Sequence, residues 1–428
     1  VQTPEPSAQV HAFARKFQQV TAPVMAKGIE DTAFYRYNAL ASLNEVGGNP
    51  NQFGFTVSAF HGASQDRAAR WPHTMLATST HDTKRSEDVR VRIDVLSELP
   101  AVWRLNLRRW SRINRSKKRK VEDGVVPSPN DEYLLYQTVL GSWPLEPLDE
   151  RSLAVYRERI QAYMVKAARE AKMHTSWVNV NEEYEAALRD FIQALLGRLD
   201  SNLFLDDFLG SQRYIAWIGM LNGLAQAAIK FASPGVPDTF QGCELWNLSL
   251  VDPDNRRPVD YALRRTLLTE IRELRAHPPE TRVSRLRELM QAPEDGRCKL
   301  YVTYCGLRLR REREALFHHG GYSALGVEGE RERQLVAFGR RLDNAGAILV
   351  APRLVTSIVP QPGFVPLGAA AWGDTAILVP WLDPRARIQN VYTGSEVRVH
   401  GGERGPHLMV SELLQDFPVA LLDFEVPQ

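Results

Sequence analysis

The chain has 428 residues, of which 44% are apolar and 24% charged, with a formal net charge of +2. This length and composition predict a folded protein of two or three domains. The near-neutral charge is not typical of a dedicated nucleic-acid-binding protein, and no apolar run approaches the length that crosses a bilayer, so neither nucleic acid nor a membrane is expected as a partner.

The cysteines predict a reducing environment. Cys243, Cys298 and Cys305 are an odd number and lack the paired spacing of a metal site. We therefore expect reduced thiols, a cytoplasmic location and no bound metal.

Periodicity predicts the elements of the first half in chain order. A helix at 13–23 leads through a short strand at 24–26 into a Gly-containing loop. A short apolar segment at 75–80 is typical of a buried parallel strand. From 87 to 222 the pattern is helical, and one apolar stripe is formed by Leu153, Tyr156, Ile160, Tyr163 and Ala167.

The second half begins with another predicted strand, at 226–231, which ends at a Pro-Gly turn. A helix then carries an apolar face that includes Leu263 and Leu274. Beyond His277 the pattern changes to β, with strands expected at 299–304, 334–338, 347–350, 375–379 and 389–400.

A His-Asp pair, His81 and Asp82, comes directly after the predicted strand at 75–80. At the carboxyl end of a barrel strand, the carboxylate of Asp82 would face a cleft and stabilise positive charge that develops on a sugar ring. The alternative is structural, with Asp82 capping a helix that starts near Ser86.

A basic segment at 104–120 contains Trp110 and follows Trp103. Basic helices with aromatic residues bind RNA in some proteins. The favoured interpretation is a solvated helix followed by a loop, because no second basic element accompanies the segment.

Several motifs together resemble one family, the maltooligosyltrehalose synthases of the α-amylase superfamily. They are MAKGIEDTAFYR at 25–36, LNEVGG at 43–48, THDTKRSEDVR at 80–90, YLLYQT at 133–138, REAKMHTSW at 169–177, PGVPD at 234–238, QGCE at 241–244 and LVDPDNRRP at 250–258. Eight motifs in this order make a specific resemblance that extends through most of the chain.

The resemblance implies an α/β fold: the carboxyl-terminal part of a (β/α)8 TIM barrel with a large α-helical insertion, followed by a C-terminal antiparallel β-domain. The expected boundaries are 1–90 for the barrel through strand seven, 91–222 for the insertion, 223–280 for strand eight and the last barrel helix, and 281–428 for the β-domain.

The activity that the resemblance implies is that of a glycosyl isomerase in trehalose biosynthesis. It converts the reducing-end α-1,4 linkage of a maltooligosaccharide to an α,α-1,1 linkage. No cofactor is expected, because glycosyl transfer needs only carboxylates and hydrogen bonds. Two alternatives stay open: an α-glucan hydrolase and a noncatalytic glucan-binding fragment.

Enzymes of the superfamily use three carboxylates, and Asp82 matches the one that stabilises the transition state. A retaining transfer also needs a nucleophile and an acid/base, about 5 Å apart. The resemblance places both in a missing N-terminal part of the same protein, so we expect this chain alone to be inactive. Glu30 and Asp31 are a less favoured substitute pair.

The resemblance also implies which residues bind substrate. The expected set is His81, Lys27, Glu30, Tyr35, Lys84, Arg85, Asp238 and Gln241. Structural roles stay open for several of them: Lys27 and Glu30 as an ion pair, and Lys84 and Arg85 as partners of acidic neighbours.

Overall fold

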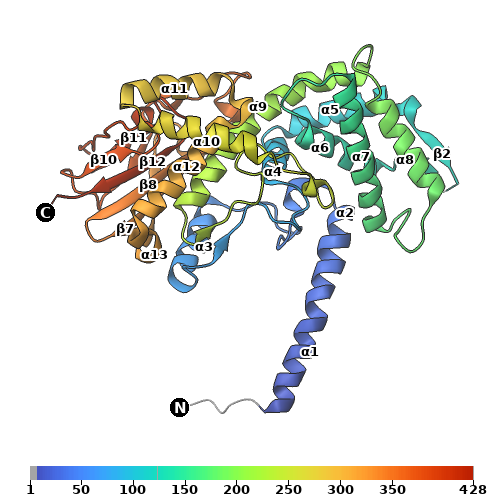
Figure 1. Ribbon diagram of the computed structural model, residues 1–428, viewed down its shortest axis with the longest axis horizontal. Helices are drawn as coiled ribbons and strands as arrows, with labels where there is room; N and C mark the ends of the chain where they lie inside the picture. Colours follow the sequence, from blue (N-terminus) through green and yellow to red (C-terminus); the bar gives the residue numbers. More distant parts are fainter. Residues whose placement is uncertain (1–6, 123, 428) are drawn as a thin grey trace.

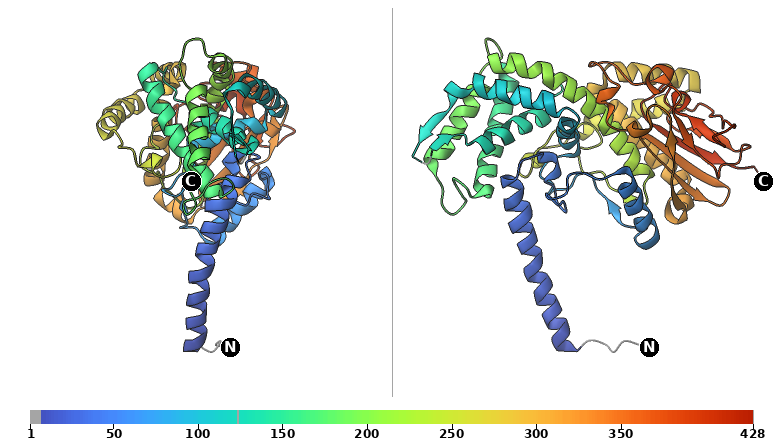
Figure 2. Two further views of the ribbon diagram at one scale, coloured as in Figure 1. Left: turned by 90° about the vertical axis from the view of Figure 1, so that its right-hand side faces the viewer. Right: turned by 180° about the vertical axis from the view of Figure 1, so that it is seen from behind.

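The body of the protein is elongated, and one long helix projects from its middle (Figures 1 and 2). The computed structural model describes residues 7–122 and 124–427. A helical part forms one end of the body, and a β-rich part that contains the C-terminus forms the other (Figure 1).

The projecting helix is α1 (Ala8–Val24), which confirms the helix predicted at 13–23. It continues as a π-helix over Met25–Ala33 and as α2 (Phe34–Arg36), so the predicted strand at 24–26 and the loop after it are wrong. Pro23 lacks a backbone donor, and the wider π-turn that follows keeps the chain helical past it.

Helices dominate the middle of the chain, as predicted. They are α3 (Val57–Arg70), α4 (Glu87–Asp94), α5 (Pro100–Ile113), α6 (Pro129–Ser142), α7 (Glu150–Ala171), α8 (Glu182–Leu195) and α9 (Leu203–Ala232). All five residues of the predicted apolar stripe lie on α7 and are buried. A small hairpin of β2 (Arg119–Val121) and β3 (Gly124–Val126) replaces the loop expected after the basic segment.

Helix α9 runs through residues 226–231, so the strand predicted there is wrong. The segment is rich in Ala, which favours helix, and a short apolar run does not distinguish a strand from a buried helix. By length and composition α9 also qualifies as a membrane span, contrary to our expectation from the sequence. However, 83% of its most apolar window is buried inside the protein, which is typical of a core helix.

The strand predicted at 75–80 is confirmed in part, as β1 (Met75–Leu76). It pairs in parallel with β4 (Val236–Pro237), which directly follows α9 and the predicted Pro-Gly turn. The second strand therefore exists, but it lies later in the chain than predicted.

Four helices precede the β-rich part: α10 (Tyr261–Ala276), α11 (Pro279–Gln291), α12 (Arg297–Glu312) and α13 (Glu314–His319). The strand predicted at 299–304 is wrong, because these residues lie in α12. Within 299–304 every residue except Tyr304 is buried, so this short segment shows no polar face by which an amphipathic helix could be recognised.

The β-rich part contains two antiparallel sheets, ordered β10-β12-β8-β7-β5 and β11-β9-β6. Its elements are β5 (Gly321–Ala324), β6 (Val327–Glu328), β7 (Leu335–Leu342), β8 (Ala345–Pro352), α14 (Gly368–Trp372), β9 (Ala376–Leu378), β10 (Arg387–Asn390), β11 (His407–Met409), α15 (Val410–Leu413) and β12 (Ala420–Glu425). The strands predicted at 334–338, 347–350 and 375–379 are confirmed.

The predicted domain boundaries stay a prediction. Helix α9 continues across residue 222, and the strands of the β-rich part begin at β5. One hydrophobic core joins the helices to a face of the five-stranded sheet, and a second lies within the β-rich part.

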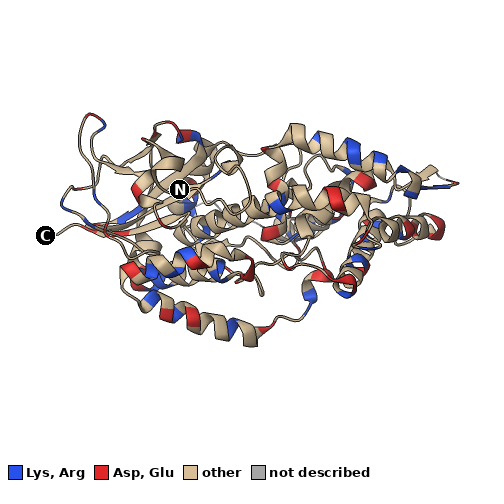
Figure 3. Ribbon diagram, turned by 90° about the horizontal axis from the view of Figure 1, so that it is seen from above, with Lys and Arg blue, Asp and Glu red and all other residues tan. Residues whose placement is uncertain are grey.

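Both tryptophans of the basic segment belong to the core. Trp110 is fully buried and its ring lies 5.5 to 5.7 Å from those of Tyr136, Phe204 and Phe208. Trp103 is also buried, so neither ring is available to stack on a base. Basic and acidic residues are interspersed along the helices (Figure 3), which favours the solvated-helix interpretation.

We expect Trp110→Ala to lower the free energy of unfolding by about 3–5 kcal/mol, because it leaves a cavity among these rings. Urea denaturation measures the change. The matched control is Trp71→Ala, whose side chain is 66% exposed in this structure and whose loss should change the stability little. Equal effects of the two substitutions would contradict the packing described.

Candidate active site

The two parallel strands place the candidate site. The amide of Asp238, just after β4, donates to the carbonyl of Leu76 at 2.9 Å. Because β1 and β4 are parallel, the segments that follow them leave from the same edge. One segment carries His81 and Asp82, and the other carries Gln241.

Asp82 lies in the turn after β1 with its side chain 83% exposed. Helix α4 has Ser86 at its N-cap position, so the capping role considered for Asp82 is wrong. The Nδ1 atom of His81 lies 3.3 Å from Oδ1 of Asp82. The pKa of Lys27 is raised, chiefly by its hydrogen bond to Asp31 and also by the charge of Asp82. Asp82 is therefore an accessible anion in a loop that holds cations.

His81 is fixed by the segment that follows β4. Its Nε2 lies 3.6 Å from Oδ1 of Asp252, and its carbonyl accepts a hydrogen bond of 2.7 Å from the side-chain amide of Asn255. Arg256 pairs with the same Asp252. The orientation of His81 thus depends on residues more than 170 positions away in the sequence.

Lys84 and Arg85 are held inside the protein by their neighbours. Glu45 accepts the amide of Lys84 at 2.7 Å and that of Arg85 at 3.3 Å. The ammonium of Lys84 lies 2.8 Å from Asp31, and the guanidinium of Arg85 donates to the hydroxyl of Tyr163 at 2.8 Å. Both cations therefore hold the loop after β1 against the segments around Asp31 and Glu45.

The charged residues of the π-helix do not form the Lys27–Glu30 ion pair that was the structural alternative. Lys27 contacts Asp31 at 2.6 Å, whereas Glu30 accepts the amide of Gly47 at 3.2 Å. Burial raises the pKa of Asp31, but the hydrogen bonds from Lys27 and Lys84 outweigh it and leave the pKa below its usual value. Lys27 keeps 76% of its side chain exposed, so it can still reach a ligand.

Three of the expected substrate-binding residues are buried. Tyr35, Lys84 and Arg85 are 2%, 5% and 1% exposed, so none of them presents an open face to a ligand in this structure, and their contact with substrate stays a prediction. Burial raises the pKa of Tyr35 well above its usual value. Gln241 is exposed and Asp238 half-buried, with the carbonyl of Asp238 accepting from Lys230 at 2.9 Å. Fewer residues are therefore accessible to a substrate than the eight expected to bind it.

A buried cluster of charges lies beneath the loop that carries Asp82. The ammonium of Lys299, from α12, lies 2.7 Å from Glu87 and 2.7 Å from Asp88, at the start of α4. Lys230, from α9, lies 3.9 Å from Glu87 and donates to Thr78 at 3.0 Å. Thr78 also donates to Glu87. The cluster therefore fixes both ends of the loop.

The same cluster reaches the segment after β4. The amide of Asn247 donates to Asp88 at 2.8 Å, and the amide of Ser86 donates to the carbonyl of Ser249 at 3.0 Å. Burial raises the pKa of Glu87, but the neighbouring lysines lower it to about 2. Glu87 is consequently ionised at neutral pH, as its pairing requires.

Sequence reasoning missed three residues that position the loop: Asp31 as an ion-pair partner, Glu45 and Lys299. Asp31 and Glu45 lie within motifs that carry the family resemblance. Nothing in the sequence indicated that Lys299 positions this loop, because Lys299 was expected in a strand of the β-domain, far from His81 in the sequence.

We expect Lys299→Met to lower the free energy of unfolding by about 3–5 kcal/mol, because it leaves two buried carboxylates short of a counter-charge. Lys120→Met is the matched control, since Lys120 is exposed, and it should change stability by less than about 0.5 kcal/mol. Urea denaturation separates the two outcomes. A Lys299 variant as stable as the control would contradict the role of Lys299 in fixing the loop that carries Asp82.

No family model matches the chain. A provisionally named maltooligosyl trehalose synthase of Mycobacterium tuberculosis (strain CDC 1551 / Oshkosh) is 35% identical over 415 residues, which are 96% of this chain and 45% of that protein. A protein of strain ATCC 25618 / H37Rv with the same name matches equally. The chain spans about half the length of the relatives it matches.

Comparison with solved structures leads to the same family. The maltooligosyltrehalose synthase of Arthrobacter ramosus is 36% identical with a TM-score of 0.74, and the match covers 96% of this chain and 46% of that one. Another maltooligosyl trehalose synthase is 30% identical with a TM-score of 0.73, and the match covers 96% and 47%. The resemblance to the maltooligosyltrehalose synthases that the motifs indicate is thus confirmed over nearly the whole chain, which has the α/β fold of the corresponding part of those enzymes.

Proposed function

We propose that this chain is part of a maltooligosyltrehalose synthase, a glycosyl isomerase that converts the reducing-end α-1,4 linkage of maltooligosaccharides to an α,α-1,1 linkage. The observation that supports this most strongly is the loop after β1. It carries a family motif, and it holds Asp82 exposed above a buried cluster of charges. The proposed substrate is a maltooligosaccharide and the proposed location is the cytoplasm.

In this proposal β1 and β4 are strands seven and eight of a (β/α)8 barrel, and the helices between them are mostly an insertion. Their parallel pairing supports this assignment. Functional side chains of such barrels lie at the carboxyl ends of the strands, where Asp82 lies here. The antiparallel sheets that follow form the C-terminal β-domain.

Asp82 is proposed to stabilise the positive charge that develops at the anomeric carbon. The nucleophile and the acid/base are proposed to come from a part of the protein outside this sequence. Glu30 is engaged with Gly47, and Asp31 with Lys27 and Lys84, so neither carboxylate is free for the chemistry. The chain alone is therefore expected to be inactive.

Isomerisation differs from hydrolysis in what happens to the freed glucose. The glucose must stay bound and attack the glycosyl intermediate through its anomeric hydroxyl, while water is kept out. The exposed members of the expected set, Lys27, His81 and Gln241, are the proposed contacts with substrate.

The test is the product profile on maltopentaose of this chain combined with the complementary part of the protein. The proposal predicts a nonreducing product with little free glucose. Free glucose in excess would favour the hydrolase, and binding of maltopentaose by the combined protein without turnover would favour the glucan-binding fragment. Full activity of the 48.4 kDa chain alone would show that the nucleophile lies within this sequence.

In the combined protein, Asp82→Asn should lower turnover by several orders of magnitude with little effect on folding, because the side chain is exposed but its charge is lost. Asp66→Asn, an exposed aspartate on α3, is the matched control and should leave turnover unchanged. Turnover and thermal unfolding of both variants are measured together. Near-normal turnover of Asp82→Asn would overturn the role of Asp82.

A further inference from the structure

One face of helix α7 lies against the segments that carry the candidate site. Four residues recur along the helix at steps of four, three and four: Arg159, Tyr163, Lys166 and Glu170. This spacing points all four side chains in nearly the same direction. The hydroxyl of Tyr163 accepts a hydrogen bond from Arg85 at 2.8 Å, so this face of α7 is turned toward the loop after β1.

Two more residues of this face hold the segment that follows β4. The Nε atom of Arg159 lies 2.7 Å from Oδ1 of Asp254, and both side chains are largely buried. Lys166 donates a hydrogen bond to the carbonyl of Asp252. Three of the four residues are therefore engaged in bonds that position the loops of the site.

Glu170, the fourth residue, is the exception. It is half-buried, yet within residues 7–122 and 124–427 its side chain makes no hydrogen bond and no ion pair. The carbonyl of the next residue, Ala171, accepts a hydrogen bond of 2.5 Å from Nε of Arg36, so this end of α7 is fixed against α2 beside the π-helix (Figures 1 and 2). Partial burial removes water from the carboxylate of Glu170 without supplying a donor, which favours a ligand that brings donors.

Glu170 also lies close to two residues of the candidate site. The pKa of Lys27 is raised chiefly by the hydrogen bond with Asp31, and the charge of Glu170 adds to this rise more than the charge of Asp82 does. Glu170 and Asp82 are thus both neighbours of the Lys27 ammonium. No ion pair joins Glu170 to Lys27 in the part of the chain that the structure describes, so these opposite charges are close but not in contact.

An anion and a cation that do not touch favour a neutral ligand rich in hydroxyl groups. A free cation would be repelled by Lys27, and an anion would be repelled by Glu170. A sugar hydroxyl can donate to the carboxylate and accept from the ammonium, and the charge strengthens bonds of both kinds. The glucose that is freed in the proposed reaction offers such hydroxyls.

We propose that Glu170 binds hydroxyl groups of the freed glucose and keeps it in the site until its anomeric hydroxyl attacks the glycosyl intermediate. The inference rests on the proposed function and adds to it a specificity-determining residue from the helices between β1 and β4. Glu170 forms and breaks no covalent bond in this role. It raises the share of the intermediate that reacts with glucose rather than with water.

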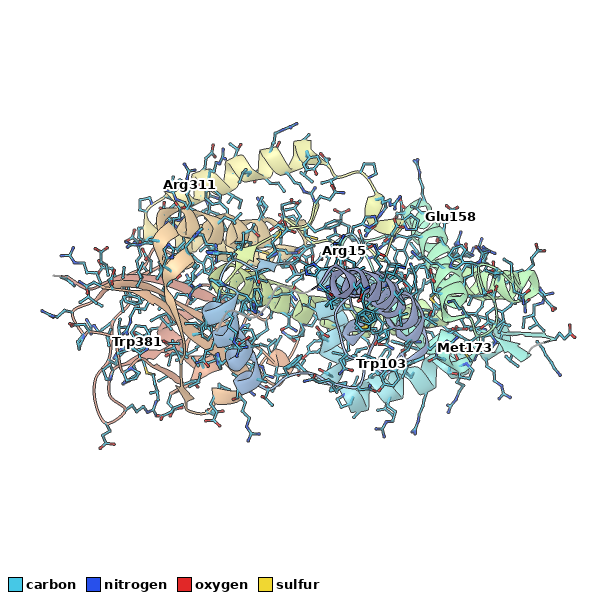
Figure 4. The ribbon with its side chains drawn as sticks, turned by 90° about the horizontal axis from the view of Figure 1, so that it is seen from below. Arg15, Trp103, Glu158, Met173, Arg311 and Trp381 are labelled. Atoms are coloured by element: carbon cyan, nitrogen blue, oxygen red, sulfur yellow. The ribbon has the colours of Figure 1, made fainter. Side chains whose placement is uncertain are left out.

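The test compares the products that the combined protein forms from maltopentaose with and without Glu170→Gln, which removes the charge and keeps the size. Loss of charge-assisted hydrogen bonds should raise the ratio of free glucose to nonreducing product about tenfold. Thermal unfolding should stay unchanged, since no bond within the described residues depends on the carboxylate. Glu158→Gln is the matched control and should change neither measurement. Glu158 is exposed on the same helix, and Figure 4 labels it together with Met173, which lies just beyond the end of α7.

A Glu170→Gln variant with the product ratio of the unaltered protein would overturn the role of Glu170. A lower unfolding temperature with an unchanged ratio would also overturn it, because Glu170 would then be purely structural. Glu170→Asp, which keeps the charge, should give a lower ratio than Glu170→Gln, and equal ratios would contradict a contact through the carboxylate. If the unaltered combined protein formed no nonreducing product at all, the proposed function would fail, and the role of Glu170 with it.

Discussion

The buried contact of Lys299 with Glu87 and Asp88 is the constraint on which the candidate site depends. It joins α12 to the start of α4, and through Asn247 it joins both to the segment that follows β4. A buried carboxylate is costly unless it is paired and hydrogen-bonded, so this geometry admits few alternatives. Asp82 can be exposed and yet fixed in position because the loop that carries it is anchored at both ends.

The cluster around Lys299 is buried, whereas the strands β1 and β4 and the helix α1 lie at the surface. The strands of the site are two residues long, and the helix that leads to the π-helix contacts no core. Lys27 and Asp31, at the foot of α1, are tied to the loop of Asp82 through Lys84.

The sequence predicted those parts of the fold whose patterns are local. The stripe on α7 and the strands β7 and β8 were predicted from the sequence pattern alone. The segments at 226–231 and 299–304 were misassigned because burial on most sides erases the period that separates helix from strand. The loop of Asp82 was located by its motif, but Lys299 was not, since a contact across 211 positions leaves no trace in one sequence. Burial of Tyr35 and Arg85 was likewise invisible, because aromatic and basic residues serve equally as ligand contacts and as buried clamps.

The role of Asp82 is tested most directly by a structure of the chain bound to its complementary part and a maltooligosaccharide. We expect the Asp82 carboxylate to lie within hydrogen-bonding distance of the sugar at the scissile linkage, in a cleft closed on its far side by carboxylates of the complementary part. We also expect the contacts of Lys299 with Glu87 and Asp88 to be unchanged. A glucan bound elsewhere, with Asp82 facing open solvent, would contradict the role of Asp82.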